Sequence, residues 1–294
     1  MHVSPAGPPL AALLVVLLAA SGCDDGRARP SDRDVTARVQ DATSRLDASA
    51  PGRDVLAAIE AHGGLATWYA NGPLAFRYAY ARVDSLGRTD SSQAPTDTRQ
   101  LVDPWSSRAV HTLAADTTVR FGWTGSQAWA VPSAEAVPTD VRFWSLTPYY
   151  FVAMPFVLAD PGVVLAAADP ITVEGRTLDQ VYVTFAAGTG DAPDDYYYLL
   201  LDPATRRVAG VRYVVSYGPF NPDGGHTPET IMLYDGAQTV GGITLQTGFR
   251  SFLWDGTGPG TPKARGTLSE VAFRPDVMAA DFGAPAGAEI QPGL

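Results

Sequence analysis

Cysteine is nearly absent from this chain, since Cys23 is the only one among 294 residues. A single cysteine cannot form a disulfide within the chain, so no internal disulfide stabilises the fold. It cannot build a structural zinc site either, because such a site uses about four ligands and no second thiol is present. Cys23 therefore has a role other than holding the fold together.

Basic residues are also scarce. The sequence has 21 Lys and Arg against 31 Asp and Glu, which gives a formal net charge of −10. Nucleic-acid binding needs clustered positive charge, and so does electrostatic adsorption to anionic lipid. The sequence contains no basic cluster, so we predict that nucleic acid is not a partner.

Long apolar runs are limited to one, at Leu10–Ala20. A run of about eleven residues is too short to cross a bilayer whose apolar core is roughly 30 Å thick. Its length is typical of a secretory signal peptide, in which small residues follow the apolar run. No second run of this kind occurs, so the rest of the chain is predicted to lie outside the bilayer.

Three small residues at and after the end of this run, Ala20-Ser21-Gly22, lead directly to Cys23 and with it resemble a bacterial lipobox. In that motif the cysteine is acylated and becomes the first residue of the mature protein. The resemblance implies that residues 1–22 are a signal peptide and that Cys23 is a membrane anchor. It also implies a place in the bacterial cell envelope, on the periplasmic face or the cell surface. An ordinary signal peptide cut nearby, with Cys23 left as a free thiol, is the alternative.

Residues 23–50 are rich in Asp, Arg, Ser and Ala and have no sustained apolar period. This composition predicts a flexible, acylated tether, followed by a single folded domain at residues 51–294. A helix is the alternative for part of this stretch, because four apolar residues are spaced to share one helical face, namely Val35, Val39, Ala42 and Leu46.

The clearest helix is predicted at Pro51–Tyr69, where proline suits the first turn. Val55, Leu56 and Ile59 form one apolar stripe along it. The glycine pair at 63–64 is typical of a helix end, so the segment up to Tyr69 is expected to continue as a further turn.

From residue 73 onward the apolar residues alternate with period two, which indicates half-buried strands. About a dozen such runs, joined by turns rich in Gly, Pro and Asp, predict a mainly β protein. Its strands are expected to form one large, strongly curved antiparallel sheet. After a first strand from residue 74, the runs lie at residues 99–103, 108–113, 118–123, 127–131, 163–168, 171–174, 178–186, 195–201, 207–217, 230–234, 243–254 and 266–273.

The segment "VRFWSLTPYYFVAMPFVLADPG", residues 141–162, differs from the strands around it. It is too aromatic for a solvent-exposed loop, and Pro148 and Pro155 interrupt any long helix. We therefore expect short helical pieces that lie across the concave face of the sheet.

Several segments resemble a family of bacterial lipoproteins related in fold to LolA and LolB, the carriers of the outer-membrane lipoprotein-sorting pathway. The resemblance implies an unclosed β-barrel of about eleven strands, with helices covering its apolar concave face. In LolA and LolB that cavity accepts acyl chains. The matching segments are "AAIEAHGGLATW", "FGWTGSQAWAV", "MPFVLADPGV" and "VTFAAGTGDAPDDYYYLLLDPATRRVAGVRY".

A cavity between the sheet and the aromatic segment is therefore expected to bind a hydrophobic ligand, either an acyl chain or a lipidated partner. A filled core with a structural role in the envelope is the alternative. Phe151, Met154 and Phe156 are expected to form a movable lid, because the two prolines deprive this segment of backbone hydrogen bonds. The ligand-binding residues are predicted to be Leu74, Phe76, Tyr78, Tyr80, Trp123, Phe151, Met154, Phe156, Tyr213 and Tyr217.

Catalytic motifs are missing from the sequence. There is no G-x-S-x-G nucleophile motif, and Thr124–Gln127 and Asp202–Arg207 are typical of tight turns. His62 is placed to cap the helix that ends before Gly63. We predict that the protein is not an enzyme and needs no cofactor. A hydrolase acting on lipid or glycan, with a site assembled only in the folded chain, is the remaining alternative.

Metal binding has two weak candidates. His226 and Glu229 could supply two ligands, but the surrounding Gly and Pro residues indicate an exposed loop. The acidic loop before the strand at 195 could offer oxygen ligands to calcium, but it lacks the spacing of a calcium loop. We predict no metal site and interpret the loop as a strand-end turn that contains Asp191, Asp194 and Asp195.

Overall fold

The computed structural model describes residues 26–92, 95–192 and 194–291. The predicted signal peptide and Cys23 lie outside these residues. Within them the helices are α1 (Asp32–Asp47), α2 (Ala50–Ala61), α3 (Leu65–Ala70) and α4 (Val141–Val152), with short 3-10 helices η1 (Ala134–Ala136), η2 (Phe156–Ala159), η3 (Gly218–Phe220) and η4 (Ala279–Phe282). The strands are β1 (Leu74–Arg82), β2 (Thr96–Asp103), β3 (Arg108–Leu113), β4 (Arg120–Trp123), β5 (Ala128–Val131), β6 (Val163–Val173), β7 (Arg176–Phe185), β8 (Tyr197–Leu201), β9 (Val208–Tyr213), β10 (Thr230–Asp235), β11 (Gln238–Val240), β12 (Ile243–Leu245), β13 (Gly248–Trp254), β14 (Pro259–Phe273) and β15 (Glu289–Ile290).

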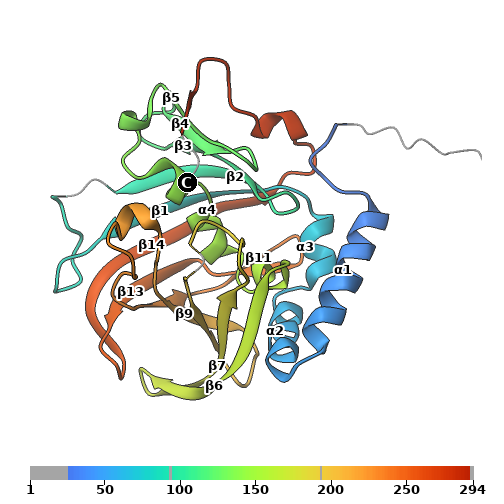
Figure 1. Ribbon diagram of the computed structural model, residues 1–294, viewed down its shortest axis with the longest axis vertical. Helices are drawn as coiled ribbons and strands as arrows, with labels where there is room; N and C mark the ends of the chain where they lie inside the picture. The colour runs from blue at the N-terminus through green and yellow to red at the C-terminus, as the bar shows by residue number, and fades with distance from the viewer. Residues whose placement is uncertain (1–25, 93–94, 193, 292–294) are drawn as a thin grey trace, which may run out of the picture.

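Thirteen of these strands form one antiparallel sheet, in the order β15-β5-β4-β3-β2-β1-β14-β13-β10-β9-β8-β7-β6. Its two edge strands, β15 and β6, do not pair with each other, so the sheet is curved but unclosed. The sheet wraps around α4, while α1, α2 and α3 lie together on one side (Figure 1). The predicted fold class, mainly β with one large curved antiparallel sheet, is confirmed.

Bulges contribute to the curvature. Register shifts occur between Ala75 and Arg77 where β1 pairs with β14, and between Ala168 and Ile171 where β6 pairs with β7. Glu270, opposite the first shift, has a positive φ of 54°. An extra residue in one strand bends it and increases its twist. The second bulge also explains why two short strands predicted at 163–168 and 171–174 are one continuous strand, β6.

The helical pieces predicted from the aromatic segment are present as α4 and η2. Phe156 of η2 stacks on Trp68 of α3, with ring centroids 4.5 Å apart and ring planes within 3° of parallel. Both side chains are fully buried, as is Leu158. The part of the concave face under α2, α3 and η2 is therefore a solid core.

The prediction of a flexible tether over residues 23–50 is wrong for residues 32–47, which form α1. Val35, Ala42 and Leu46 are buried against the rest of the molecule. Arg38 fixes the helix further, because its guanidinium donates to the Trp105 carbonyl at 2.7 Å and to Asp160 at 2.9 Å. The apolar spacing, the alternative considered for this stretch, outweighs a composition typical of a spacer.

No helix within the described residues is both long and apolar enough to cross a membrane.

The packing of α1 predicts that Leu46→Ala destabilises the protein. Leu46 is buried in the main core, and deleting such a side chain costs about 2 to 4 kcal/mol through lost burial and a cavity. Asp41→Ala, which removes only an exposed ion pair with Arg45 on the same helix, should change stability by less than about 1 kcal/mol. Urea unfolding measures both. Equal, negligible effects would show that α1 is not part of the folded core.

Candidate functional site

Two contacts near the start of α4 hold this helix against the concave face. Asp140 caps it by accepting a hydrogen bond from the Phe143 amide at 2.7 Å. From the sheet, His111 of β3 donates through Nε2 to the Ser145 carbonyl at 2.9 Å. These contacts fix the helix while leaving a space between its other face and strands β1, β8, β9 and β10.

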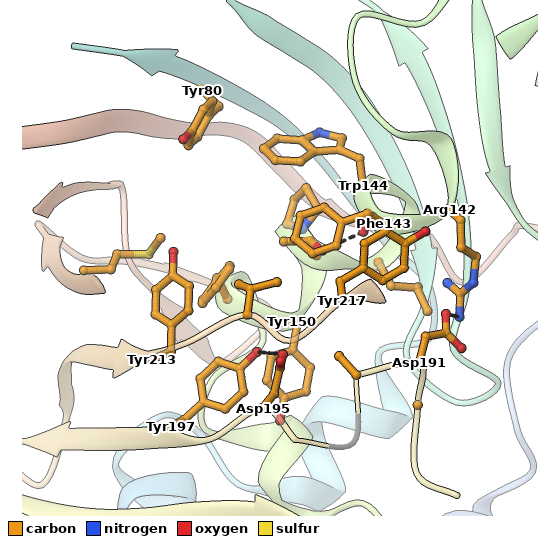
Figure 2. A pocket seen from close by; sticks show the side chains of 18 of the residues that line it. Tyr80, Arg142, Phe143, Trp144, Tyr150, Asp191, Asp195, Tyr197, Tyr213 and Tyr217 are labelled. Atoms are coloured by element: carbon orange, nitrogen blue, oxygen red, sulfur yellow. Dashed lines mark hydrogen bonds and ion pairs between the residues drawn. The ribbon is translucent and has the colours of Figure 1, made fainter. Parts of the chain in front are cut away.

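This space is a cavity of about 290 Å³ that is partly open to solvent. Its wall is mainly aromatic and aliphatic, and Figure 2 shows the rings arranged around it. The lining residues come from β1, α4, the loop before β8, β8, β9 with the segment after it, and β10: Tyr78, Tyr80, Arg142, Phe143, Trp144, Leu146, Thr147, Pro148, Tyr150, Phe151, Gly190, Asp191, Ala192, Asp195, Tyr197, Tyr213, Val215, Tyr217 and Met232.

The interior end of the cavity is lined by tyrosines that stay neutral. Burial raises the pKa of Tyr78, Tyr80 and Tyr213 above the ordinary value for tyrosine. Their hydroxyls have no hydrogen-bond partner within the described part of the chain. Tyr234, which lies beneath them, differs because its hydroxyl donates to the Phe151 carbonyl at 2.6 Å.

Asp195 is the one buried carboxyl in the wall. It accepts hydrogen bonds from the Ser216 amide at 2.5 Å and from the Ser216 hydroxyl at 2.9 Å. Burial raises its pKa, and these hydrogen bonds oppose that rise. The carboxyl holds the loop before β8 to the segment after β9.

The rim of the cavity is charged. Arg142, at the start of α4, forms an ion pair with Asp191 and lies over the Trp123 ring, 3.6 Å from its centroid. Beside them, Tyr217 donates a hydrogen bond to the cap residue Asp140 at 3.2 Å. The cavity therefore changes from charged at the rim to neutral and aromatic inside.

Half of the predicted ligand-binding residues meet in this wall. They are Tyr78, Tyr80, Phe151, Tyr213 and Tyr217.

The other half lie elsewhere. Leu74, Phe76, Met154 and Phe156 point inward but are fully packed in the solid core, and Trp123 lies beside the rim under Arg142. The predicted lid is not supported, because Met154 and Phe156 are each 1% exposed and cannot lift without opening the core. Residues 153–159 instead pack in the core between the sheet and the N-terminal helices.

Several lining residues were not predicted. Trp144 and Tyr150 lie in the aromatic segment, and their positions on α4 separate them from the core-facing Tyr149. Tyr197 is the middle one of three successive tyrosines, so strand alternation places it on the opposite face from its neighbours. Arg142 gave no sequence signal, and Asp195 was interpreted only as part of a strand-end turn, because only the fold brings α4 and the loop before β8 to one cavity.

The other sequence candidates have structural roles. His62 is sandwiched between main-chain groups, with Nδ1 2.7 Å from the Thr244 carbonyl and Nε2 accepting from the Val208 amide at 3.1 Å. Within residues 26–92, 95–192 and 194–291, no group of three or more His, Cys, Asp or Glu side chains could hold a metal ion.

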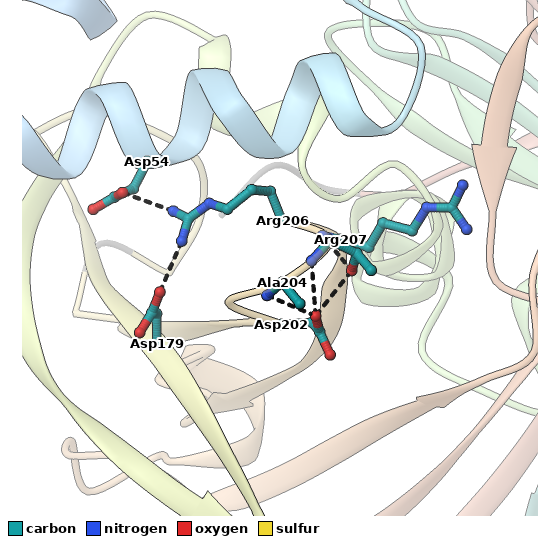
Figure 3. A network of polar contacts seen from close by, with 7 residues as sticks. Asp54, Asp179, Asp202, Ala204, Arg206 and Arg207 are labelled. Atoms are coloured by element: carbon teal, nitrogen blue, oxygen red, sulfur yellow. Dashed lines mark hydrogen bonds and ion pairs between the residues drawn. The ribbon is translucent and has the colours of Figure 1, made fainter.

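The turn at Asp202–Arg207 does more than connect β8 to β9. Arg206 donates to Asp179 of β7 and to Asp54 of α2, both at 2.7 Å, as Figure 3 shows. Asp202 closes the turn itself by accepting from the Thr205 amide at 2.9 Å. The turn thus links α2 to the sheet.

Comparison with known proteins identifies the fold. No family model matches the sequence, and no curated protein matches it. Among solved structures, a LolA superfamily protein from Nitrosomonas europaea superposes with a TM-score of 0.51 at 10% identity, over 80% of this chain and 99% of that chain. The chain therefore has a LolA-like fold.

Two further solved structures resemble the present chain less closely. An outer-membrane lipoprotein-sorting protein domain from Vibrio parahaemolyticus has a TM-score of 0.45 at 9% identity, over 72% of this chain and 90% of that one. A DUF1329 family protein from Desulfovibrio piger has a TM-score of 0.47 at 11% identity, over 85% and 97%. The LolA-like fold implied by the sequence resemblance is confirmed, and identities this low concern the fold alone.

Below the cavity, His111 predicts a pH dependence of stability. Burial lowers the pKa of His111 to about 4, against an ordinary histidine value of about 6.5. The unfolded chain therefore binds a proton more readily than the folded protein, so stability falls as the pH falls from 7 to 5. The loss from this residue is about 2 kcal/mol. Burial also lowers the pKa of His62, which adds in the same direction.

Urea unfolding at pH 7 and pH 5 measures this effect. His111→Gln should flatten the dependence by about 2 kcal/mol, while His226→Gln, at an exposed position, should keep the wild-type dependence. Carboxyls that titrate in every variant cancel in this comparison. If the free energy of unfolding changes equally between pH 7 and pH 5 in wild type and in His111→Gln, the lowered pKa of His111 is not the cause.

Proposed function

We propose that this protein is a lipid-anchored protein of the bacterial cell envelope that binds one hydrophobic molecule in the cavity beneath α4, without catalysing a reaction. The observation that carries the proposal is the uneven filling of the concave face. Under η2 and α3 the aromatic side chains pack to a solid core, whereas under α4 a cavity of about 290 Å³ stays open.

The wall of this cavity suits an apolar occupant. Trp144, Phe151 and Met232 offer apolar surface, and the only buried carboxyl, Asp195, is already hydrogen-bonded by Ser216. Ligand sites are commonly concave, largely apolar and furnished with a few polar groups. A purely structural protein has no need to keep such a space open.

A binding role is favoured over catalysis by how the reactive side chains near the cavity are used. The hydroxyls of Ser145 and Thr147 donate to carbonyls one turn earlier in α4, at 2.6 Å each. The buried histidines His62 and His111 contact main-chain groups and do not line the cavity. No described hydroxyl in the wall is therefore paired with a histidine base.

The membrane anchor is proposed from the sequence motif. With Cys23 acylated, residues 24–31 would connect the lipid to α1, whose first residue is Asp32. Intact-mass measurement of protein extracted from membranes should show a chain that begins at Cys23 and carries acyl groups. A mature chain that begins elsewhere, or an unmodified Cys23, would exclude the anchor.

Binding is tested by filling the cavity. Val215 lines it, so Val215→Trp should occupy the space and weaken binding of dodecanoate or 1-tetralone at least tenfold. Val164→Trp makes the same substitution at an exposed site of the edge strand β6 and should bind like wild type. Isothermal titration calorimetry measures affinity, and melting temperature confirms folding.

Two results oppose the proposal. If Val215→Trp is folded and binds as tightly as wild type, the ligand does not occupy this cavity. If wild-type protein binds neither compound, the concave face has only a structural role.

A further inference from the structure

We propose that the cavity selects a neutral molecule with an oxygen atom at its buried end, such as a ketone, an ester or an alcohol, rather than the methyl end of an acyl chain. This inference rests on the proposed function and names the class of ligand. It follows from three tyrosine hydroxyls that line the interior of the cavity, those of Tyr78, Tyr80 and Tyr213.

The three hydroxyls come from the two strands that form the interior end. Tyr78 and Tyr80 lie on the same face of β1, and Tyr213 ends β9. In Figure 2 the hydroxyl of Tyr213 points toward Tyr80, and the hydroxyl of Tyr80 points back toward Tyr213. None of the three has a hydrogen-bond partner within the described residues, although other polar groups of the wall do.

Two neighbouring tyrosines have partners, whereas Trp144 Nε1 and the Tyr150 hydroxyl, also in the wall, are buried and have none within the described residues. Tyr217 at the rim donates to Asp140 at 3.2 Å, and Tyr234 beneath the cavity donates to Phe151 at 2.6 Å. A buried hydroxyl that loses water without gaining another partner is costly. A methyl group placed at this end would displace water from three hydroxyls and replace none of their hydrogen bonds. An oxygen atom would accept at least one.

Charge favours a neutral oxygen. The ionisable groups that face the three hydroxyls are mainly other tyrosines, with Asp195 beyond Tyr213 and Arg82 beyond Tyr80. The nearest cation in the wall, Arg142, is at the rim and is already paired with Asp191. A carboxylate at the interior end would therefore lose its water with only Arg82, beyond Tyr80, as a nearby positive charge, and the Asp195 carboxyl would oppose it.

Size limits the occupant to one small molecule. A volume of about 290 Å³ lies at the lower end of the range for ligand sites, which is roughly 300 to 1,000 Å³. The core-packed side chains of Phe76, Met154 and Phe156 fill the neighbouring part of the concave face. The cavity itself is therefore too small to enclose a lipid with several acyl chains.

A matched pair of ligands tests this inference. 1-Tetralone and tetralin share one carbon skeleton and differ by the ketone oxygen. Calorimetry measures how many times more tightly 1-tetralone binds than tetralin. We expect this ratio to fall at least tenfold when the hydroxyls are removed in Tyr78→Phe/Tyr80→Phe/Tyr213→Phe. Tenfold corresponds to the loss of about one hydrogen bond, or roughly 1.4 kcal/mol. Tyr198→Phe, outside the cavity wall, should leave the ratio unchanged.

A single variant and a second ligand keep the test usable if the triple variant misfolds. If the triple variant does not fold, Tyr213→Phe alone should still lower the ratio, and 1-naphthoate should bind wild type more weakly than 1-tetralone. An affinity ratio that is the same in wild type and in the folded tyrosine variants would overturn the inference. If tetralin and dodecanoate bind but the ratio does not change, the proposed function stands and only the ligand class is wrong. If no compound binds wild type, both fail.

Discussion

An unclosed sheet has one constraint that the rest of this structure satisfies: its apolar concave face must be covered by something other than the sheet. Here η2 and the N-terminal helices cover one part by direct packing, with Phe156 stacked on Trp68. Helix α4 covers the other part: contacts at its first turns, including the hydrogen bond from His111 to the Ser145 carbonyl, fix it against β3, and a space remains between its other face and β1, β8, β9 and β10. The cavity exists because the two parts of residues 141–162 cover the face in different ways.

The polar groups of the cavity follow from the same arrangement. Rim groups are close to solvent, and there Arg142 and Asp191 can stay charged as an ion pair. Interior groups come from strands that curve beneath α4, where burial keeps tyrosines neutral by raising their pKa. The result is an apolar space with neutral hydroxyls at one end and charge at the other. Such a gradient can orient a molecule as well as bury it, which a uniformly apolar core cannot do.

The sequence predicted the fold class well because alternation and turn residues are local signals. Of the two prolines expected to interrupt the aromatic segment, Pro155 separates α4 from η2, whereas α4 continues through Pro148. The sequence favoured a flexible tether over α1, because a composition rich in charge and alanine was given more weight than the stripe of Val35, Ala42 and Leu46, which supported only the alternative. For the site, alternation identified Tyr78, Tyr80 and Tyr213 as inward residues. It did not separate them from Leu74 and Phe76 on the same strand face, because only the placement of η2 and α4 decides which inward residues are covered. The positions of Arg142 and Asp195 depend on contacts between segments far apart in the chain, which no local pattern encodes.

The central claim is that the space under α4 holds one small molecule with a buried oxygen. Native mass spectrometry of the mature protein, extracted gently from the cells that produce it, tests this most directly. We expect a 1:1 complex with a single neutral, oxygen-containing compound that is small enough for a cavity of about 290 Å³ and is released on mild activation. A protein that carries no adduct in any preparation, or one that carries a lipid with several acyl chains, would contradict it.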